Sequence, residues 1–230
     1  MRAVHRERDG WTGANGTHHH RIPLGLLMLE QGWITQSQLR QALEAQKSAG
    51  KGRLGEWLIR AGAIDEQTVT RALALQWSCP VLPVHSESAG VSTVMPRIFV
   101  DAFGALPLRY GSGRVVYLGF EESLDTTLAL AVEQMTGLRV ESGIVQESIF
   151  RRAHPHLLGQ RFPGAEIFEA SSESAAGFCL AKSLESARAV EARLVRVHDC
   201  LWMRAWIHPS SAPEPDLDSV RDVVCSIVDA

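Results

Sequence analysis

Apolar residues recur at helical spacing near the start of the chain, and the pattern there occurs twice. Residues 23–46 align without gaps to residues 53–76, thirty positions further on, and 7 of the 24 aligned positions are identical. The glycines and the closing glutamine keep their register in both copies. Self-similarity of this kind indicates a duplicated supersecondary unit, so we expect two copies of one small fold in tandem.

Each copy predicts two short helices joined by a tight turn. Pro23 suits the opening position of a helix, and apolar residues follow at helical spacing until Gly32, a residue type that readily ends a helix. Thr35 and Gln38 then match a capping box at the start of a second helix. The second copy repeats the scheme with Asp65 as the N-cap. The sequence therefore predicts two helix hairpins.

The middle of the chain alternates β-prone and helical runs. The Gly-Ser-Gly at 111–113 separates two β-prone runs, which predicts a hairpin rather than a nucleotide-binding loop, because no third glycine follows at the spacing of that motif. Asp125 then caps an amphipathic helix that ends near Gly137. The expected strands are 105–110, 115–120 and 138–140, and a further helix is expected at 146–152.

The last third of the chain shows weaker patterns. Residues 159–175 are rich in Gly, Ser, Glu and Ala, which is typical of a linker. After them we expect a helix near 176–190, two strands at 192–197 and 201–207, and an amphipathic helix over 217–228 with its Leu, Val and Ile residues on one side.

These patterns predict an α+β fold. It comprises an N-terminal tandem helix-hairpin repeat packed with a small α/β subdomain, plus a C-terminal helix–β-hairpin–helix module that is marginally stable alone, so we expect it to be docked on another part. The expected segments are a disordered basic arm (1–21), the tandem repeat (22–80), the α/β subdomain (81–158), the linker (159–175) and the C-terminal module (176–230).

The composition is that of a compact protein. The 230 residues, 45% of them hydrophobic, can form one or two domains. No apolar run approaches the roughly 18 residues of a membrane span, and the N-terminus lacks the apolar centre of a signal peptide. The four cysteines are scattered singly, which indicates neither a disulfide framework nor a zinc knuckle. We therefore expect a cytoplasmic location without membrane insertion.

Charge is distributed unevenly along the chain. The net charge is −3, yet residues 1–60 carry nine Lys and Arg against five Asp and Glu. This bias is compatible with a small anionic ligand or with an ordinary solvated surface. It is far from the dense basic stripe of a duplex-binding protein, so we expect neither DNA nor RNA as a partner.

Polar residues on the apolar stripes of the repeat require an explanation. Gln46 and Gln76 lie at the edge of faces that should be buried, where an unpaired amide costs about 1–3 kcal/mol. Gly25 and Gly55 stand in the first turn of a helix, where free N–H groups favour an anion, and Arg53 precedes one of them. A guanidinium and an amide can bind a phosphate or a guanine edge. Alternatively, the glutamines cap neighbouring carbonyls and the glycines permit close helix packing.

These residues resemble the twice-repeated motif of the MshEN family, the cyclic di-GMP-binding N-terminal domain of type II secretion and type IV pilus assembly ATPases. The motif opens on R-L-G and closes on L-x-x-Q. The second copy departs from it only at Ala63, whereas the first departs at Trp33 and at Pro23, where the motif has arginine. The similarity continues into the N-terminal domain of general secretion protein E and covers about residues 22–158.

The resemblance implies a ligand site for cyclic di-GMP. Its aliphatic residues would pack against the sugars and bases of the ligand, and its arginine and glutamines would make polar contacts. Carried over by position, the implied binding residues are Leu24, Gly25, Met28, Leu29, Leu39, Leu43, Gln46, Arg53, Leu54, Gly55, Leu58, Ile59, Val69, Leu73 and Gln76.

Enzyme motifs are missing from the sequence. The nearest string to a P-loop, residues 50–55, is followed by Glu56 and Trp57, where a P-loop needs Lys and Ser or Thr. Neither a metalloprotease nor a nucleophile-elbow motif occurs. The three histidines at 18–20 are typical of a surface tract, although such a tract binds transition metals adventitiously. We expect no catalytic residue, no metal site and no cofactor, and no ATPase domain.

Three hypotheses follow from the sequence. The first is a non-enzymatic cyclic di-GMP receptor or adaptor that passes the signal to secretion, pilus or motility machinery. The second is a ligand-free module of the same fold that docks a secretion or pilus component. The third is a small enzyme with an undetected site. The loss of arginine at Pro23 favours the second hypothesis, and the nearly intact second motif favours the first.

Overall fold

The repeat folds as two helix hairpins, as its sequence predicts. The computed structural model describes residues 21–84, 91–208 and 215–228. Its first four helices, the helical repeat, are α1 (Leu24–Glu30), α2 (Gln36–Ala49), α3 (Leu54–Arg60) and α4 (Glu66–Gln76). Thr35 and Gln38 form the expected capping box, and Gly32 and Gly62 adopt left-handed φ angles of 68° and 66° between the helices. Asp65 caps α4 by accepting the Thr68 N–H over 2.8 Å.

The two copies pack against each other crosswise. α1 contacts α4, and α3 contacts α2, so each first helix lies on the second helix of the other copy. Their shared core consists of Met28, Ile34, Leu39, Ala42, Leu58 and Ala72. Because the contacts are reciprocal, the helical repeat has a local pseudo-two-fold arrangement.

The middle of the chain forms an α/β unit. It consists of α5 (Arg97–Phe103), β1 (Ala105–Gly111), β2 (Val115–Phe120), α6 (Thr126–Thr136), β3 (Arg139–Ile144) and α7 (Glu147–Leu158). The strand order is β1-β2-β3, with β1 antiparallel and β3 parallel to β2. The expected hairpin and the Asp125 cap of α6 are confirmed, since Asp125 Oδ1 accepts the Leu128 N–H over 2.9 Å.

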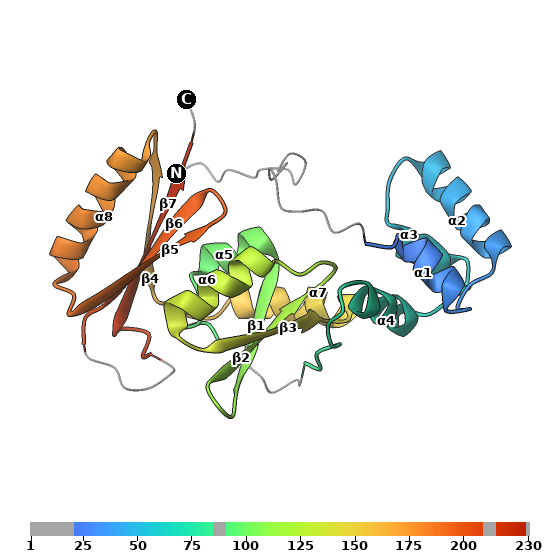
Figure 1. The fold of residues 1–230 in the computed structure, drawn as a ribbon, viewed down its shortest axis with the longest axis horizontal. Coiled ribbons are helices and arrows are strands. Elements are labelled where there is room, and N and C mark those ends of the chain that lie inside the picture. Colours follow the sequence, from blue (N-terminus) through green and yellow to red (C-terminus); the bar gives the residue numbers. More distant parts are fainter. Residues whose placement is uncertain (1–20, 85–90, 209–214, 229–230) are drawn as a thin grey trace.

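The C-terminal unit is a four-stranded sheet covered by one helix. It consists of β4 (Gly164–Ala170), α8 (Glu173–Ala187), β5 (Glu191–Val197), β6 (Cys200–Trp206) and β7 (Val220–Ile227), in the order β4-β7-β6-β5. Figure 1 shows α8 on the outer face of this sheet and the α/β unit between the sheet and the helical repeat.

Two expectations for the tail are wrong. The expected linker, residues 159–175, contains β4, and the expected last helix, residues 217–228, is the strand β7, which pairs with both β4 and β6. β7 is covered on both faces, so it has a run of apolar residues instead of strict alternation, and such a run is not distinguished from a helix by periodicity. Its three valines favour the strand.

One apolar core joins the C-terminal sheet to the α/β unit. Trp202 of β6 is fully buried and packs edge-on against Phe99 of α5, with ring centroids 5.5 Å apart. The same buried cluster contains Val195, Val197 and Val224 of the C-terminal sheet together with buried residues of the α/β unit. In the parts of the chain that the structure describes, every helix is too short or too polar to cross a membrane.

Candidate functional site

The residues implied as ligand contacts divide into buried and accessible groups. Met28 and Leu58, equivalent positions of the two copies, have no exposed surface and lie in the core of the helical repeat. Leu39 is also buried, whereas Leu43 is 45% exposed. Any ligand on the surface of the repeat therefore contacts the accessible members of the motif, while the buried members shape the hairpins beneath them.

The two glutamines make reciprocal contacts across the copies. Gln46 Nε2 donates to the Gly52 carbonyl over 2.8 Å, and Gln76 Nε2 donates to the Ile22 carbonyl over 2.7 Å. Gly52 follows Ile22 by the same thirty residues that separate the glutamines. Each glutamine thus caps a carbonyl just before the opening residue of a motif, as one of the alternatives from the sequence requires.

The motif glycines allow the helices to approach closely. A Cβ on Gly25 would lie 2.7 Å from Leu39 Cδ1, and a Cβ on Gly55 would lie 2.9 Å from Val69 Cγ1. Both distances are too short for real atoms, so a larger residue at either position would displace a neighbouring side chain. The structure thereby supports the helix-packing role of these glycines.

Seven of the implied residues line one narrow cleft beside the second copy. The cleft holds about 80 Å³, well below the roughly 300 Å³ at which ligand pockets of small-molecule size begin. A ligand with two guanine bases is therefore accommodated only on open surface or after the cleft widens. The implied residues that line it are Leu24, Arg53, Leu54, Gly55, Ile59, Val69 and Leu73, and its wall also includes Glu121, Glu122 and Glu147.

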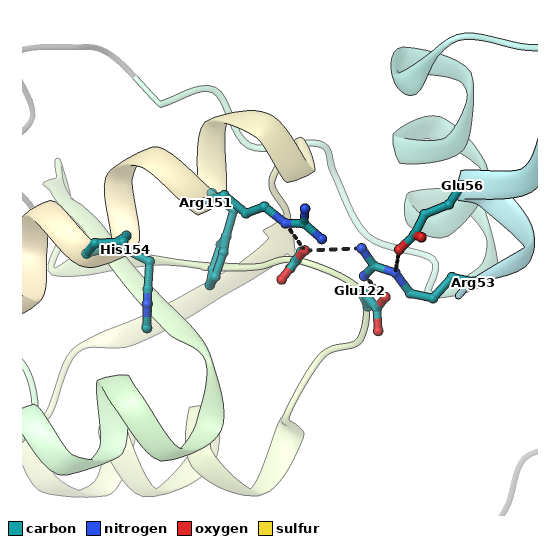
Figure 2. Close-up of a pocket in the computed structure, with 8 residues that line it drawn as sticks. Arg53, Glu56, Glu122, Arg151 and His154 are labelled. Atoms are coloured by element: carbon teal, nitrogen blue, oxygen red, sulfur yellow. Dashed lines mark hydrogen bonds and ion pairs between the residues drawn. The ribbon is translucent and has the colours of Figure 1, made fainter. Parts of the chain in front are cut away.

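Arg53, the N-cap residue of α3, lies among four glutamates, of which Figure 2 labels Glu56 and Glu122 beside it. Its Nε donates to Glu56 Oε1 over 3.0 Å. Its Nη2 lies 2.8 Å from Glu147 Oε1 and 3.4 Å from Glu121 Oε1, and its Nη1 pairs with Glu122. Three of these carboxylates belong to the α/β unit, so Arg53 connects that unit to the helical repeat.

Arg151 of α7 is a second cation in the same cluster. Its Nη2 lies 2.5 Å from Glu147 Oε1, and its Nε lies 3.6 Å from Glu121 Oε1. The two arginines border an open pocket of about 490 Å³, and Figure 2 shows His154 on the opposite side of Arg151 from Arg53. The other lining residues are Glu56, Glu121, Glu122, Phe150 and Pro155. With three carboxylates against two guanidiniums, the lining of this pocket is net negative.

The surroundings of Arg53 keep it cationic. Burial by itself would lower the pKa of the guanidinium, but the hydrogen bond to Glu56 and the charges of Glu147, Glu121 and Glu56 together raise the pKa above its ordinary value. A phosphate that accepts two parallel hydrogen bonds from this guanidinium would displace at least one carboxylate, because Glu56, Glu121, Glu122 and Glu147 already contact its Nε, Nη1 and Nη2 atoms.

Glu66, at the start of α4, makes a second contact between the units. Its carboxylate accepts the Ser148 N–H over 2.6 Å, the Ser148 hydroxyl over 2.9 Å and Gln146 Nε2 over 2.7 Å. Burial opposes ionisation, yet the hydrogen bonds from Gln146 and Ser148 outweigh it and lower the pKa of Glu66. Glu66 is not among the residues that the motif predicts. The sequence does show that the two copies differ here, since the first copy has Gln36 at the equivalent position.

The first copy lacks a counterpart of the Arg53 cluster at its opening residue. Pro23 occupies the N-cap position of α1. The nearby Arg21 places its guanidinium carbon 3.3 Å from the centre of the Trp77 ring, next to Gln76. The two copies therefore share the hydrogen bond from a glutamine side chain to a backbone carbonyl, but they differ at the start of the motif, where only the second copy has an arginine.

Metal and thiol chemistry have little support in the described part of the chain. No group of three His, Cys, Asp or Glu side chains suited to a metal ion occurs among the residues of 21–84, 91–208 and 215–228. The three histidines at 18–20 lie outside the described residues. Burial raises the pKa of the Cys79, Cys200 and Cys225 thiols, which opposes their use as nucleophiles at neutral pH.

Comparisons with known proteins point to one kind of machinery. No family model matches the chain. It is 28% identical over 179 residues, 75% of its length, to the type IV pilus assembly ATPase PilB of Thermus thermophilus, and 26% identical over 149 residues, 62% of its length, to PilB of Myxococcus xanthus. It spans 20% and 25% of the lengths of these relatives. The chain is thus similar to a part of pilus assembly ATPases, in agreement with the resemblance seen in its sequence.

Two solved structures are also similar to the chain. A structure of MshE with cdg shares 28% identity, covers 60% of this chain and 99% of that one, and has a TM-score of 0.48. The N-terminal domain of XpsE shares 17% identity, covers 58% of this chain and 92% of that one, and has a TM-score of 0.40.

Proposed function

We propose that this chain is a non-enzymatic receptor or adaptor that binds cyclic di-GMP through its helical repeat. It passes the signal to a secretion, pilus or motility protein in the cytosol. The similarity to PilB over 75% of the chain supports the link to this machinery. Support for the ligand comes from the repeat itself.

The observation that carries the proposal is the reciprocal packing of the two copies. Gln46 and Gln76 make the same contact in opposite directions, at 2.8 and 2.7 Å, and each first helix packs on the second helix of the other copy. Cyclic di-GMP is itself two-fold symmetric, with a guanine and a phosphate in each half. A pseudo-two-fold protein surface can therefore present similar groups to both halves of such a ligand.

Arg53 is the group best suited to hold one half of the ligand. Its planar fork can bind a phosphate or the O6/N7 edge of guanine in two parallel hydrogen bonds. Leu24, Leu54 and Leu73 line the cleft beside it and offer apolar surface to a base or sugar. We propose that the ligand lies over this cleft and widens it.

A ligand-free interaction module is the second candidate. It is favoured by Pro23, which removes one of the two expected arginines, and by the carboxylates that already surround the other. In this case the helical repeat would serve only to present the α/β unit to a secretion or pilus component.

Calorimetric titration of the full chain with cyclic di-GMP separates the two candidates. If the chain is a receptor, it is expected to bind the ligand with a dissociation constant in the micromolar range or lower. The Arg53→Ala and Gln76→Ala variants are expected to give no heat of binding, and circular dichroism is expected to show that both remain folded. Arg139→Ala, which removes an exposed arginine paired with Glu141 in β3, is the matched control and should bind normally. A wild-type chain that gives no heat at tens of micromolar ligand overturns the receptor in favour of the interaction module.

A further inference from the structure

The helical repeat is attached to the α/β unit largely through polar and charged contacts. One contact is made by Arg53 with Glu121 and Glu122, which follow β2, and with Glu147, which opens α7. A second is made by Glu66 with the first turn of α7. On the side of the helical repeat both contacts are made by side chains, at a partly open surface where the Arg53 side chain is 35% exposed.

Backbone pairing holds the chain between the two units in place. The Leu82 N–H donates to the Ile144 carbonyl over 2.8 Å, and the Ile144 N–H donates to the Pro80 carbonyl over 3.0 Å. These bonds lie at the end of β3, beside α4. If the Arg53 contacts were lost, the helical repeat would stay tethered there and through Glu66, and it would be able to pivot about these two attachments.

An anionic ligand and the α/β unit compete for the same guanidinium. Arg53 has five N–H donors, and four carboxylates surround them. Glu121, Glu122 and Glu147 would also repel a phosphate placed near Arg53, and Arg151 offsets only part of this charge. A phosphate bound to Arg53 through two parallel hydrogen bonds therefore displaces at least one of these carboxylates and is repelled by those that remain.

We propose that Arg53 is an electrostatic clasp: an anionic ligand that takes its guanidinium releases Glu121, Glu122 and Glu147 and frees the helical repeat to pivot on the α/β unit. This inference rests on the proposed function, because cyclic di-GMP is the anion in question. Ligand binding is thereby converted into a change of arrangement that a partner protein can sense. The ligand-free chain is held in one arrangement by the carboxylates.

The first test removes the clasp without any ligand. Spin labels at positions 47 and 112, both exposed, report the distance between α2 and the β1–β2 turn in a full chain whose four native cysteines are replaced by serine. Arg53→Met is expected to broaden the distance distribution and shift its mean, whereas Arg139→Met, the matched control from the Arg139–Glu141 pair, leaves it unchanged. An unchanged distribution in Arg53→Met overturns the clasp whether or not the chain binds a ligand.

The second test measures the competition itself. The double variant Glu121→Gln/Glu122→Gln keeps the shape of both side chains and removes their charge, so it is expected to bind cyclic di-GMP about tenfold more tightly than the wild type. Glu141→Gln, which neutralises a carboxylate paired with Arg139, should bind like the wild type. A residue with a purely structural role would lower the affinity when altered, which is the opposite direction.

The outcomes of the second test separate the two proposals. If the wild type binds cyclic di-GMP and the double variant binds it equally or more weakly, the clasp is overturned and the proposed receptor function stands. Absence of binding by both proteins overturns the receptor and, with it, the coupling to a ligand. Tighter binding by the double variant, together with a shifted distance in Arg53→Met, supports both.

Discussion

The α/β unit is joined to a neighbour on each side, and the two joints are built differently (Figure 1). Toward the C-terminal sheet the joint is a continuous apolar core with Trp202 at its centre. Inside it, Arg204 and Asp222 form an ion pair at 1% and 0% side-chain exposure. Toward the helical repeat the joint depends on Arg53 and Glu66, which lie at partly exposed positions.

The buried joint is fully connected by hydrogen bonds. Asp222 Oδ1 accepts Arg204 Nε over 2.7 Å and Trp202 Nε1 over 2.9 Å, and Oδ2 accepts Arg204 Nη2 over 2.8 Å. Arg204 Nη1 donates to the Thr93 carbonyl of the α/β unit over 2.8 Å. The groups of this network are shielded from water, which could otherwise replace their hydrogen-bond partners, so the network favours a permanent attachment between the sheet and the α/β unit. The exposed joint exchanges its partners with ions and water at little cost, which suits a switch.

The largest expected effect comes from breaking the buried pair. Asp222→Asn leaves Arg204 as a buried cation without its counter-charge and should lower the free energy of unfolding by about 3–5 kcal/mol. Urea denaturation of the full chain followed by circular dichroism measures the loss. The double variant Arg204→Met/Asp222→Leu should recover much of it, because no uncompensated charge remains. A loss below about 1 kcal/mol in Asp222→Asn would contradict the contrast between the joints.

The second effect concerns the backbone part of the joint to the helical repeat. A Cβ on Gly143 would lie 2.5 Å from the Pro80 carbonyl oxygen, and a backbone atom cannot move aside as a flexible side chain can. Gly143→Ala should therefore cost about 1–3 kcal/mol of unfolding free energy, measured in urea. Gly177→Ala on α8, where the new Cβ meets no neighbour, is the control and should be neutral or stabilising.

The third effect distinguishes the copies of the repeat. Glu66→Gln gives the second copy the residue type of Gln36 in the first, and should lower the stability at pH 7 by about 1 kcal/mol because charge-assisted hydrogen bonds to Ser148 and Gln146 are weakened. The pKa of Glu66 is lowered on folding, so its contribution is present above the ordinary pKa of 4.5 and is lost as the pH falls through the folded pKa.

Urea denaturation at pH values from 7 down to 3 tests this pH dependence. The stability of the wild type should fall more steeply below about pH 4.5 than that of Glu66→Gln, so the two curves should converge at low pH. Parallel curves over the whole range would show that Glu66 does not gain its stabilisation from the ionised form.

The smallest effect on stability is expected at Arg53. Arg53→Met should cost at most about 1 kcal/mol at low salt, because the guanidinium is partly solvated and its ion pairs are screened. The difference from the wild type should vanish in about 1 M NaCl, where the Debye length is about 3 Å. Urea, being uncharged, is the appropriate denaturant. A difference that persists at high salt would mean that Arg53 acts through packing instead of charge.

Local elements were predicted well and distant pairings were not. The helix hairpins and the Asp125 cap depend on residues within a few positions of one another, so their signals are complete in the local sequence. β4 and β7 were missed because their identity as strands depends on pairing with each other over more than fifty residues. The candidate motif was found, but Glu121 is 68 residues from Arg53, and nothing in the motif indicates this contact.

The sequence by itself determined the duplicated hairpins, the middle hairpin and the position of the one motif arginine, because spacing, caps and turns act over short distances along the chain. Only the tertiary structure decided which glutamine meets which carbonyl, which strands share a sheet, and that three glutamates of the α/β unit surround Arg53. These depend on how buried surfaces and opposite charges meet across the fold. The same arginine is therefore the ligand contact that the motif predicts and an inter-unit contact in the structure.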